Sequence, residues 1–210
     1  MKRTASVLLG LLLVGAVATA AEGWKPLFNG KDFTGWKNPD PTRFLVEDGC
    51  LVGTQTDGRG ADMFTTDSFD NFELRFTYKV KWPANSGVWF RDRYQFDILK
   101  WRNPKTFSGA LYYPGCKGTF AFKNLDESLE KRDDWNQAQV YANGDHIVFW
   151  LNGTKLGEVH NERFTKGRIG LQVHGGGGFK NMKITIKSIE IRPLGPDDKP
   201  TPPPAPKAEK

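Results

Sequence analysis

Alternation of apolar and polar residues is the clearest pattern along the chain. From Phe72 to Trp82 the even-numbered positions are aromatic or aliphatic and the odd-numbered positions are polar. Because successive side chains of a strand point to opposite faces, this pattern predicts a β-strand with one buried and one solvated face. A similar run from Met182 to Lys187 continues with the opposite parity at Ile189 and Ile191. That slip predicts a β-bulge or a change of face near residue 188.

Tight turns separate several further apolar runs. Asn143-Gly144 and Asn152-Gly153 divide the runs 140–142, 146–151 and 154–159. Asn-Gly favours the type I′ turns of hairpins, so a three-stranded meander is predicted here. Residues 43–46 and 50–53 predict another hairpin around Glu47-Asp48-Gly49, and residues 125–132 predict one short helical turn.

Many short strands with turn signals between them favour an all-β, antiparallel β-sandwich over a parallel α/β sheet. A sandwich has two inner faces to cover with apolar side chains. Aromatic residues of such a fold are more often part of the core than of a site. The pattern therefore assigns these four to the core: Trp82, Phe90, Phe96 and Trp150.

The two ends of the chain differ from the middle. Residues 1–20 read as a signal peptide, with basic Lys2 and Arg3, an apolar run over 7–17 and small residues before Ala21. The apolar run is too short to span a membrane, so we expect an exported protein in the periplasm or outside the cell. Residues 22–193 form one domain. Residues 194–210 are rich in proline and lysine and predict a disordered tail, which could contact the cell envelope.

Charge and cysteine content narrow the class further. The formal net charge of +6 is spread along the chain without a basic cluster or nucleic-acid motif, so nucleic acid is not an expected partner. Cys50 and Cys116 could pair in an oxidising compartment. Alternatively, Cys50 is a small core residue and Cys116 a loop thiol. Their spacing does not match a metal site.

Residues 85–97 combine the side chains that grip a sugar. If 85–91 and 94–97 are neighbouring antiparallel strands, Trp89, Arg91, Gln95 and Asp97 share one surface. That surface would hold an aromatic platform, a cation, an amide and a carboxylate. The alternative is a surface ion pair between Arg91 and Asp97, which contributes little stability.

Two other segments carry candidate chemistry. Gln172 and His174 share a face immediately before the glycines 175–178, and His174 could act as a base or a metal ligand near neutral pH. The alternative is a histidine that closes a strand above a flexible loop. Residues 108–113 lie on a long connection, where Tyr112 could line a sugar cleft together with Trp101 and Phe107.

In their order along the chain, several segments resemble the 3-keto-disaccharide hydrolase (DUF1080) domain family, also described as the 3-keto-glucoside-1,2-lyase/3-keto-2-hydroxy-glucal hydratase family. The segments are Leu27-Phe28-Asn29-Gly30-Lys31-Asp32-Phe33-Thr34-Gly35-Trp36, Asn85-Ser86-Gly87-Val88, Tyr94-Gln95-Phe96-Asp97-Ile98-Leu99, Gly109-Ala110-Leu111-Tyr112, Trp135-Asn136, Leu151-Asn152-Gly153 and Gly170-Leu171-Gln172-Val173-His174-Gly175.

The resemblance implies a jelly-roll sandwich of the concanavalin A-like lectin/glucanase type that acts on oxidised glycosides outside the cytoplasm. The chain departs from the family pattern in one strand. Gln95 stands where glutamate is common, Asp97 where glutamine is common, and Lys100 where aspartate is common. This places catalysis in question more than fold or sugar binding, and a non-catalytic carbohydrate-binding module is the alternative.

The implied chemistry needs a base near C2 of the sugar, and positive charge or hydrogen-bond donors near the C3 oxygen. We assign the base to Asp97 or His174. Arg91 would stabilise the enediolate, with Gln95 or a divalent metal ion as further candidates. Trp89 and Tyr112 would stack on sugar rings and Gln172 would bind substrate.

Overall fold

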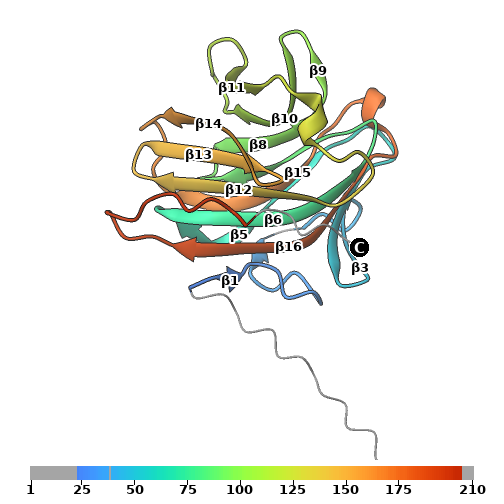
Figure 1. The fold of residues 1–210 in the computed structure, drawn as a ribbon. Helices are drawn as coiled ribbons and strands as arrows, with labels where there is room; N and C mark the ends of the chain where they lie inside the picture. The colour runs from blue at the N-terminus through green and yellow to red at the C-terminus, as the bar shows by residue number, and fades with distance from the viewer. Residues whose placement is uncertain (1–22, 38, 205–210) are drawn as a thin grey trace, which may run out of the picture.

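Two antiparallel β-sheets stack face to face in the computed structural model, which describes residues 23–37 and 39–204 (Figure 1). The first sheet, sheet A, has the order β14-β13-β12-β6-β16-β4-β3, and β1 pairs with β16. Its strands are β14 (Thr154–His160), β13 (His146–Leu151), β12 (Asn136–Asn143), β6 (Phe72–Lys81), β16 (Lys183–Pro193), β4 (Cys50–Thr54), β3 (Phe44–Glu47) and β1 (Lys25–Pro26).

Sheet B has the order β11-β10-β8-β7-β15-β5-β2, and β9 pairs with β10. Its strands are β11 (Phe120–Asn124), β10 (Lys105–Tyr112), β8 (Tyr94–Leu99), β7 (Asn85–Phe90), β15 (Gly167–Val173), β5 (Ala61–Phe69), β2 (Trp36–Lys37) and β9 (Trp101–Arg102). Two single-turn 3-10 helices, η1 (Glu127–Leu129) and η2 (Gly177–Phe179), lie in connections. Within the described residues no helix is long and apolar enough to cross a membrane.

The core fills the space between the inner faces of the two sheets. The even-numbered side chains of β6 from Phe72 to Val80 are buried there, as their alternation predicted. Sheet B supplies the opposite layer through residues such as Val88, Phe96 and Leu171. Packing of the two apolar faces confirms the antiparallel sandwich.

Most of the predicted local elements are present. The meander β12-β13-β14 and the hairpin β3-β4 are present. Asn152 and Gly153 both have positive φ, as the predicted type I′ turn requires, whereas Asn143 pairs with His146 and only Gly144 of the β12–β13 turn has positive φ. In β16 the register against β6 shifts between Ile186 and Ser188, which confirms a bulge. The turn predicted over residues 125–132 is η1.

One predicted loop is a strand. Residues 105–112 form β10, which pairs with β8 on one side and β11 on the other. The prediction was wrong because nearly every position of β10 is buried. A strand that is covered on both faces has no regular polar alternation to reveal it.

The predictions for the ends of the chain and for the two cysteines have different outcomes. Residues 1–22, which include the predicted signal peptide, lie outside the described residues, as do 205–210. The segment 194–204, predicted to be disordered, instead turns back after β16 and runs across β6 and β12 (Figure 1). Cys50 on β4 and Cys116 in the β10–β11 connection are free thiols on different sheets.

Candidate functional site

The outer face of sheet B carries polar side chains in register across neighbouring strands. Gly87 of β7 lies opposite Asp97 of β8, and Asp97 lies opposite Ala110 of β10. On the other side, Gly87 lies opposite Gln172 of β15, which lies opposite Asp62 of β5. Because side chains directly opposite each other share a face, Asp62, Gln172 and Asp97 form one row, with small residues between them.

A second row runs parallel to the first. Trp89 lies opposite both Gln95 and Gly170, and Gln95 lies opposite Tyr112. The Trp89 and Tyr112 rings meet edge to face with centroids 6.1 Å apart. The paired strands therefore bring aromatic, amide and carboxyl groups from distant parts of the sequence onto one surface.

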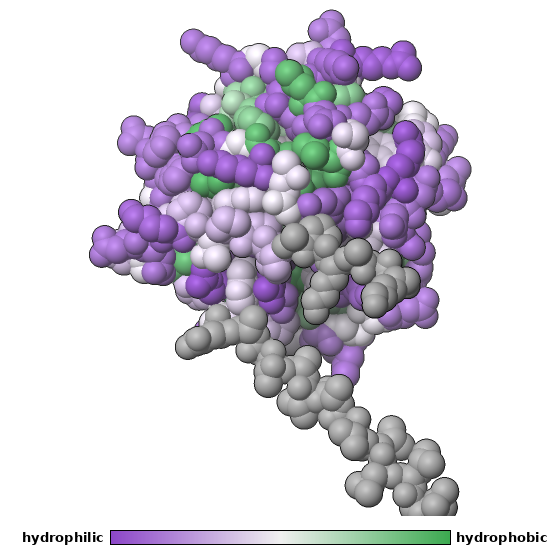
Figure 2. Space-filling model, in the orientation of Figure 1, coloured by the Kyte–Doolittle hydropathy of each residue, from purple (hydrophilic) through white to green (hydrophobic). Residues whose placement is uncertain are grey.

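Most side chains of these rows line a cavity of about 310 Å³, which we call the site cavity. Its volume is at the lower end of the range of small-molecule pockets. It is lined by Asn85, Trp89, Gln95, Asp97, Leu99, Trp101, Tyr112, Thr119, Phe120, Gln172 and His174. The structure thus brings together six of the seven residues that we selected from the sequence, and Arg91 is the exception. Figure 2 shows hydrophobic residues between hydrophilic ones at the end of the molecule where β9, β10 and β11 lie.

Asp97 is the buried acid of the site cavity. Only 4% of the residue is exposed, and burial raises the pKa of its carboxyl group well above the usual value. No described residue donates a hydrogen bond to it. A carboxyl group without a partner in a cavity is suited to exchange a proton with a ligand.

Gln95 adds an unpaired donor beside Asp97. The residue is 2% exposed, and its Nε2 amide nitrogen has no hydrogen-bond partner within the described part of the chain. Its side chain lies over Gly87, where a Cβ atom would approach the Gln95 Cδ to 2.7 Å. A buried donor without a partner costs free energy that a ligand oxygen would recover.

Asp62 was missed from the sequence. Its Oδ1 accepts a 2.7 Å hydrogen bond from the indole Nε1 of Trp89. Desolvation raises the pKa of Asp62, while the hydrogen bonds from Trp89 and Gln172 and the charge of His174 act against this shift. The polar face of β5 was the only signal for it, and that strand alternates too weakly to stand out.

His174 directly follows β15 and begins the glycine-rich loop. Its backbone nitrogen donates to the Asn85 carbonyl at 3.2 Å, and its ring Nδ1 lies within hydrogen-bond distance of the Gly175 carbonyl oxygen. The ring also meets Phe179 edge to face at 5.7 Å. These contacts hold an exposed imidazole at the rim of the site cavity.

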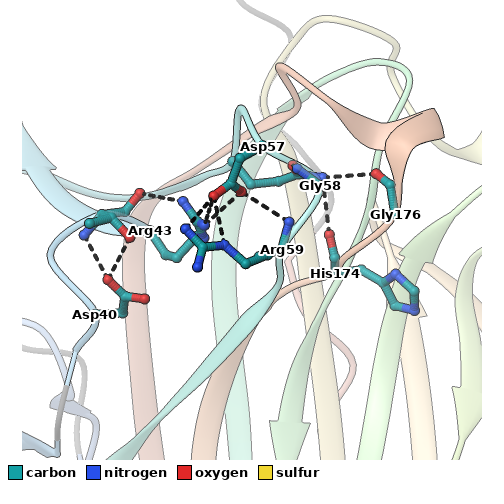
Figure 3. A network of polar contacts seen from close by, with 9 residues as sticks. Asp40, Arg43, Asp57, Gly58, Arg59, His174 and Gly176 are labelled. Carbon is teal, nitrogen blue, oxygen red and sulfur yellow. Dashed lines mark hydrogen bonds and ion pairs between the residues drawn. The ribbon is translucent and has the colours of Figure 1, made fainter.

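A polar network around the buried residues Gln55 and Arg43 supports this loop (Figure 3). Gln55 donates through Nε2 to the backbone carbonyls of His174 and Gly176 at 3.4 and 3.2 Å, and its Oε1 accepts from the Gly58 nitrogen at 2.7 Å. Next to it, the Arg43 guanidinium binds both carboxylate oxygens of Asp57 at 2.6 and 2.7 Å. The loop that carries His174 is therefore fixed to the β4–β5 connection.

Arg91 does not belong to the site cavity, so its predicted placement was wrong. It lies beyond the end of β7 with a φ of 51°, and the alternation of faces does not continue through such a residue. Its guanidinium is buried and donates to the carbonyls of Asp70, Gly144 and Phe164. It does not line the site cavity, and it does not form the alternative ion pair with Asp97. Desolvation lowers its pKa.

The donor set of the cavity does not fit a metal ion. Among residues 23–37 and 39–204, no group of three or more histidine, cysteine, aspartate or glutamate side chains is placed to hold one. The site cavity instead combines amides with separate acids. We therefore assign no step to a metal ion.

Solved structures with this architecture include carbohydrate-active and carbohydrate-binding proteins. A Parabacteroides distasonis protein assigned as a glycosyl hydrolase is 26% identical with a TM-score of 0.62, over 81% of this chain and 99% of that one. The carbohydrate recognition domain of Emp47p shares the fold at 14% identity, with a TM-score of 0.60 over 83% and 96% of the two chains. The fold and the cavity define a carbohydrate-active, concanavalin A-like β-sandwich.

Within that class, the chain belongs to the 3-keto-alpha-glucoside-1,2-lyase-like domain family, which matches residues 23–192. The resemblance seen in the sequence is thereby confirmed. A 3-keto-disaccharide hydrolase from Bacteroides thetaiotaomicron is 36% identical over 80 residues. That match covers 33% of this chain and 28% of the relative, so it spans less than a third of the relative's length.

Proposed function

We propose that the site cavity binds a 3-keto-glucoside and cleaves its bond at C1 by elimination, followed by hydration of the unsaturated sugar. The observation that carries the proposal is the pair of unpartnered groups at the cavity wall. Asp97 supplies a buried carboxyl group with a raised pKa, and Gln95 supplies a buried amide donor that has no partner among the residues that the structure describes.

The chemistry follows from the ketone. A carbonyl at C3 acidifies the hydrogen at C2, so a base can remove that proton and leave an enediolate. The electron pair then forms the C1–C2 double bond as the C1–O bond breaks, and the leaving oxygen takes up a proton. Water adds across the double bond in the second stage. The reaction needs a proton acceptor at C2 and a donor at the C3 oxygen.

The residues of the cavity can take these parts. Ionised Asp97 removes the C2 proton, and its raised pKa makes it a stronger base than an ordinary carboxylate. Gln95 Nε2 donates to the C3 oxygen as negative charge develops there, the part first assigned to Arg91. His174 at the rim protonates the leaving oxygen or serves as the alternative base. Trp89 and Tyr112 supply apolar walls for the ring.

Two alanine variants test this assignment. We expect Asp97→Ala and His174→Ala each to lower kcat for a 3-keto-glucoside by about 100-fold or more, since a lost general acid or base removes that much. His160→Ala is the matched control, because His160 is exposed, bonds Asp145 and does not line the site cavity. Folding of each variant is checked by circular dichroism.

Unchanged turnover in both cavity variants would contradict the mechanism. The rival function is a binding module, and it is favoured if the wild-type protein binds glucosides in calorimetry but releases no product. The replacement of the family glutamate by Gln95 is the sequence feature that motivates this rival.

A further inference from the structure

A second hollow lies on the outer face of sheet A, on the other side of the sandwich from the site cavity. Its volume is about 380 Å³, and it lies over β6 and β16, between the β3–β4 hairpin and the turn before β12. We call it the lysine hollow, because Lys79, Lys81 and Lys183 line it. None of these residues has a part in the proposed reaction.

The lysines crowd two neighbouring strands. Lys183 of β16 lies directly opposite Lys81 of β6, and the next pair on the same face joins Thr185 to Lys79. Like charges directly opposite each other destabilise a sheet. Lys183 forms an ion pair with Glu47, whereas Lys79 and Lys81 form none with the residues that the structure describes. An anionic ligand would neutralise this excess of positive charge.

Trp135 holds part of this charge in place. It lies immediately before β12, and the ammonium groups of Lys79 and Lys187 are 4.9 and 5.5 Å from the centroid of its ring. Cation–π contacts attract an ammonium group without neutralising it. Trp135 is half-buried and lines the lysine hollow, so it also gives the hollow an aromatic wall. The hollow therefore suits a ring that carries a negative group.

Two acids border the lysines. Asp48 lies in the β3–β4 turn and Asp133 in the turn before β12, so the order of the strands places them on opposite sides of β6 and β16. Neither forms an ion pair within residues 23–37 and 39–204. A carboxylate accepts hydrogen bonds from hydroxyl groups and repels other anions. The lysine hollow thus offers cations in the middle and acceptors for hydroxyl groups on both sides.

We propose that the lysine hollow binds an acidic glycan through a uronic acid residue. The carboxylate of the sugar binds Lys79 and Lys81, its hydroxyl groups donate to Asp48 or Asp133, and its ring packs against Trp135. A polyphosphate chain has no hydroxyl groups to offer the two acids, which would repel it. This binding is separate from the site cavity and does not rest on the proposed function.

Calorimetry of the full chain with tetragalacturonate tests the site, at about 0.15 M salt to screen distant charges. We expect the wild type to bind it and not to bind its neutral methyl ester. Lys79→Met and Lys81→Met keep an apolar stem and lose the charge, and each should weaken binding by about tenfold. Lys123→Met, at an exposed position of β11 on sheet B, changes the net charge equally and should leave the affinity unchanged.

Asp133→Asn separates a sugar site from a general anion patch. Asparagine tolerates the left-handed backbone of this residue, whose φ is 58°, and removes only the charge. We expect binding of tetragalacturonate to weaken by about threefold, because hydrogen bonds to a charged acceptor are stronger. Equal or tighter binding would overturn the proposal, since loss of a negative charge favours any anion.

Three further results would also overturn it. They are a wild type that does not bind tetragalacturonate, an affinity unchanged in both lysine variants, and equally tight binding of a polyphosphate of similar charge. Turnover of a 3-keto-glucoside has no part in these measurements. Failure of the lysine hollow is therefore distinguishable from failure of the proposed function.

Discussion

The carboxyl group of Asp97 is buried without a partner in residues 23–37 and 39–204, and its ionisation should oppose folding. Burial holds its native pKa well above the usual value of 3.8. Between the unfolded and native pKa values the native state binds more protons, so stability falls as pH rises through this window. Asp97→Asn cannot ionise. We expect it to be more stable than wild type at pH 8 by about 1 to 3 kcal/mol, the size of an unpaired buried polar group.

The difference should shrink as pH falls and be small near pH 4, where the carboxyl group of native wild type is protonated and that of the unfolded chain is partly protonated. Urea unfolding at pH 4, 6 and 8 measures it. Asp67→Asn, at an exposed position of β5, is the matched control and should show no such change with pH. An Asp97→Asn protein that is less stable than wild type at pH 8 would show that the carboxylate has a stabilising partner.

For single residues, the alternation of apolar and polar positions along the strands predicted most of the candidate site. It placed Trp89, Gln95 and Asp97 on one face because each lies within a regular strand. It failed at Arg91, because that residue follows the last position of β7 and adopts a left-handed conformation. Which way a side chain turns after a strand ends depends on distant carbonyls, here those of residues 70, 144 and 164.

At the scale of elements, Gln55 links the β4–β5 connection to the loop that carries His174. It is fully buried, and three backbone groups depend on its side-chain amide. Gln55→Leu keeps the volume but leaves these groups without partners, at about 1 to 3 kcal/mol for a buried group. We expect amide hydrogen exchange at Gly58 to become at least tenfold faster, and kcat to fall more than KM rises.

Gln137→Leu is the control for this change, since Gln137 is an exposed residue of β12. It should alter neither exchange in the loop nor turnover. If Gln55→Leu leaves exchange at Gly58 as in wild type, the amide does not hold the loop. A second variant, Gln55→Glu, keeps the acceptor for the Gly58 nitrogen but loses the donor to the two carbonyls. If it restores the slow exchange of wild type at Gly58 but not kcat, the acceptor role of Oε1 is separated from the donor role of Nε2.

Elements with one wet face could be predicted, and those covered on both faces could not. β6 and β16 alternate because their outer positions are polar, and even the bulge in β16 was visible as a slip in parity. β10 lies between β8 and β11 and is buried almost throughout. Its sequence therefore lacked the alternation, and Tyr112 was assigned to a loop although it is held by a strand.

For the whole molecule, the outer faces of the two sheets have different roles. The outer face of sheet B carries the site cavity, whereas part of the outer face of sheet A is covered by the segment 194–204. Glu73 of β6 is fully buried there, paired with Arg192 at 2.5 Å and bonded to the Thr201 nitrogen at 2.8 Å. Composition could not predict this cover, because it depends on hydrogen bonds to particular residues as well as on the packing of Leu194 against Tyr141, Val148 and Trp150.

The covering segment should contribute to stability. Tyr141 donates to the Asp198 carbonyl at 2.8 Å, and Gln139 donates to the Thr201 carbonyl at 2.7 Å. A chain that ends at Leu194 loses these bonds together with the one between Thr201 and Glu73. At about 0.5 to 1.5 kcal/mol for each net hydrogen bond, we expect a loss of about 2 to 4 kcal/mol. For a domain of this size that lowers Tm by roughly 4 to 16 °C.

A chain that ends at Pro204 is the matched control, since it removes only residues 205–210 and keeps every bond described for Thr201. Its Tm should equal that of the full chain. Turnover at 25 °C should be the same in both truncated proteins, because the cover and the site cavity lie on opposite sheets. If the chain that ends at Leu194 has the same Tm as the full chain, residues 195–204 do not stabilise the sandwich.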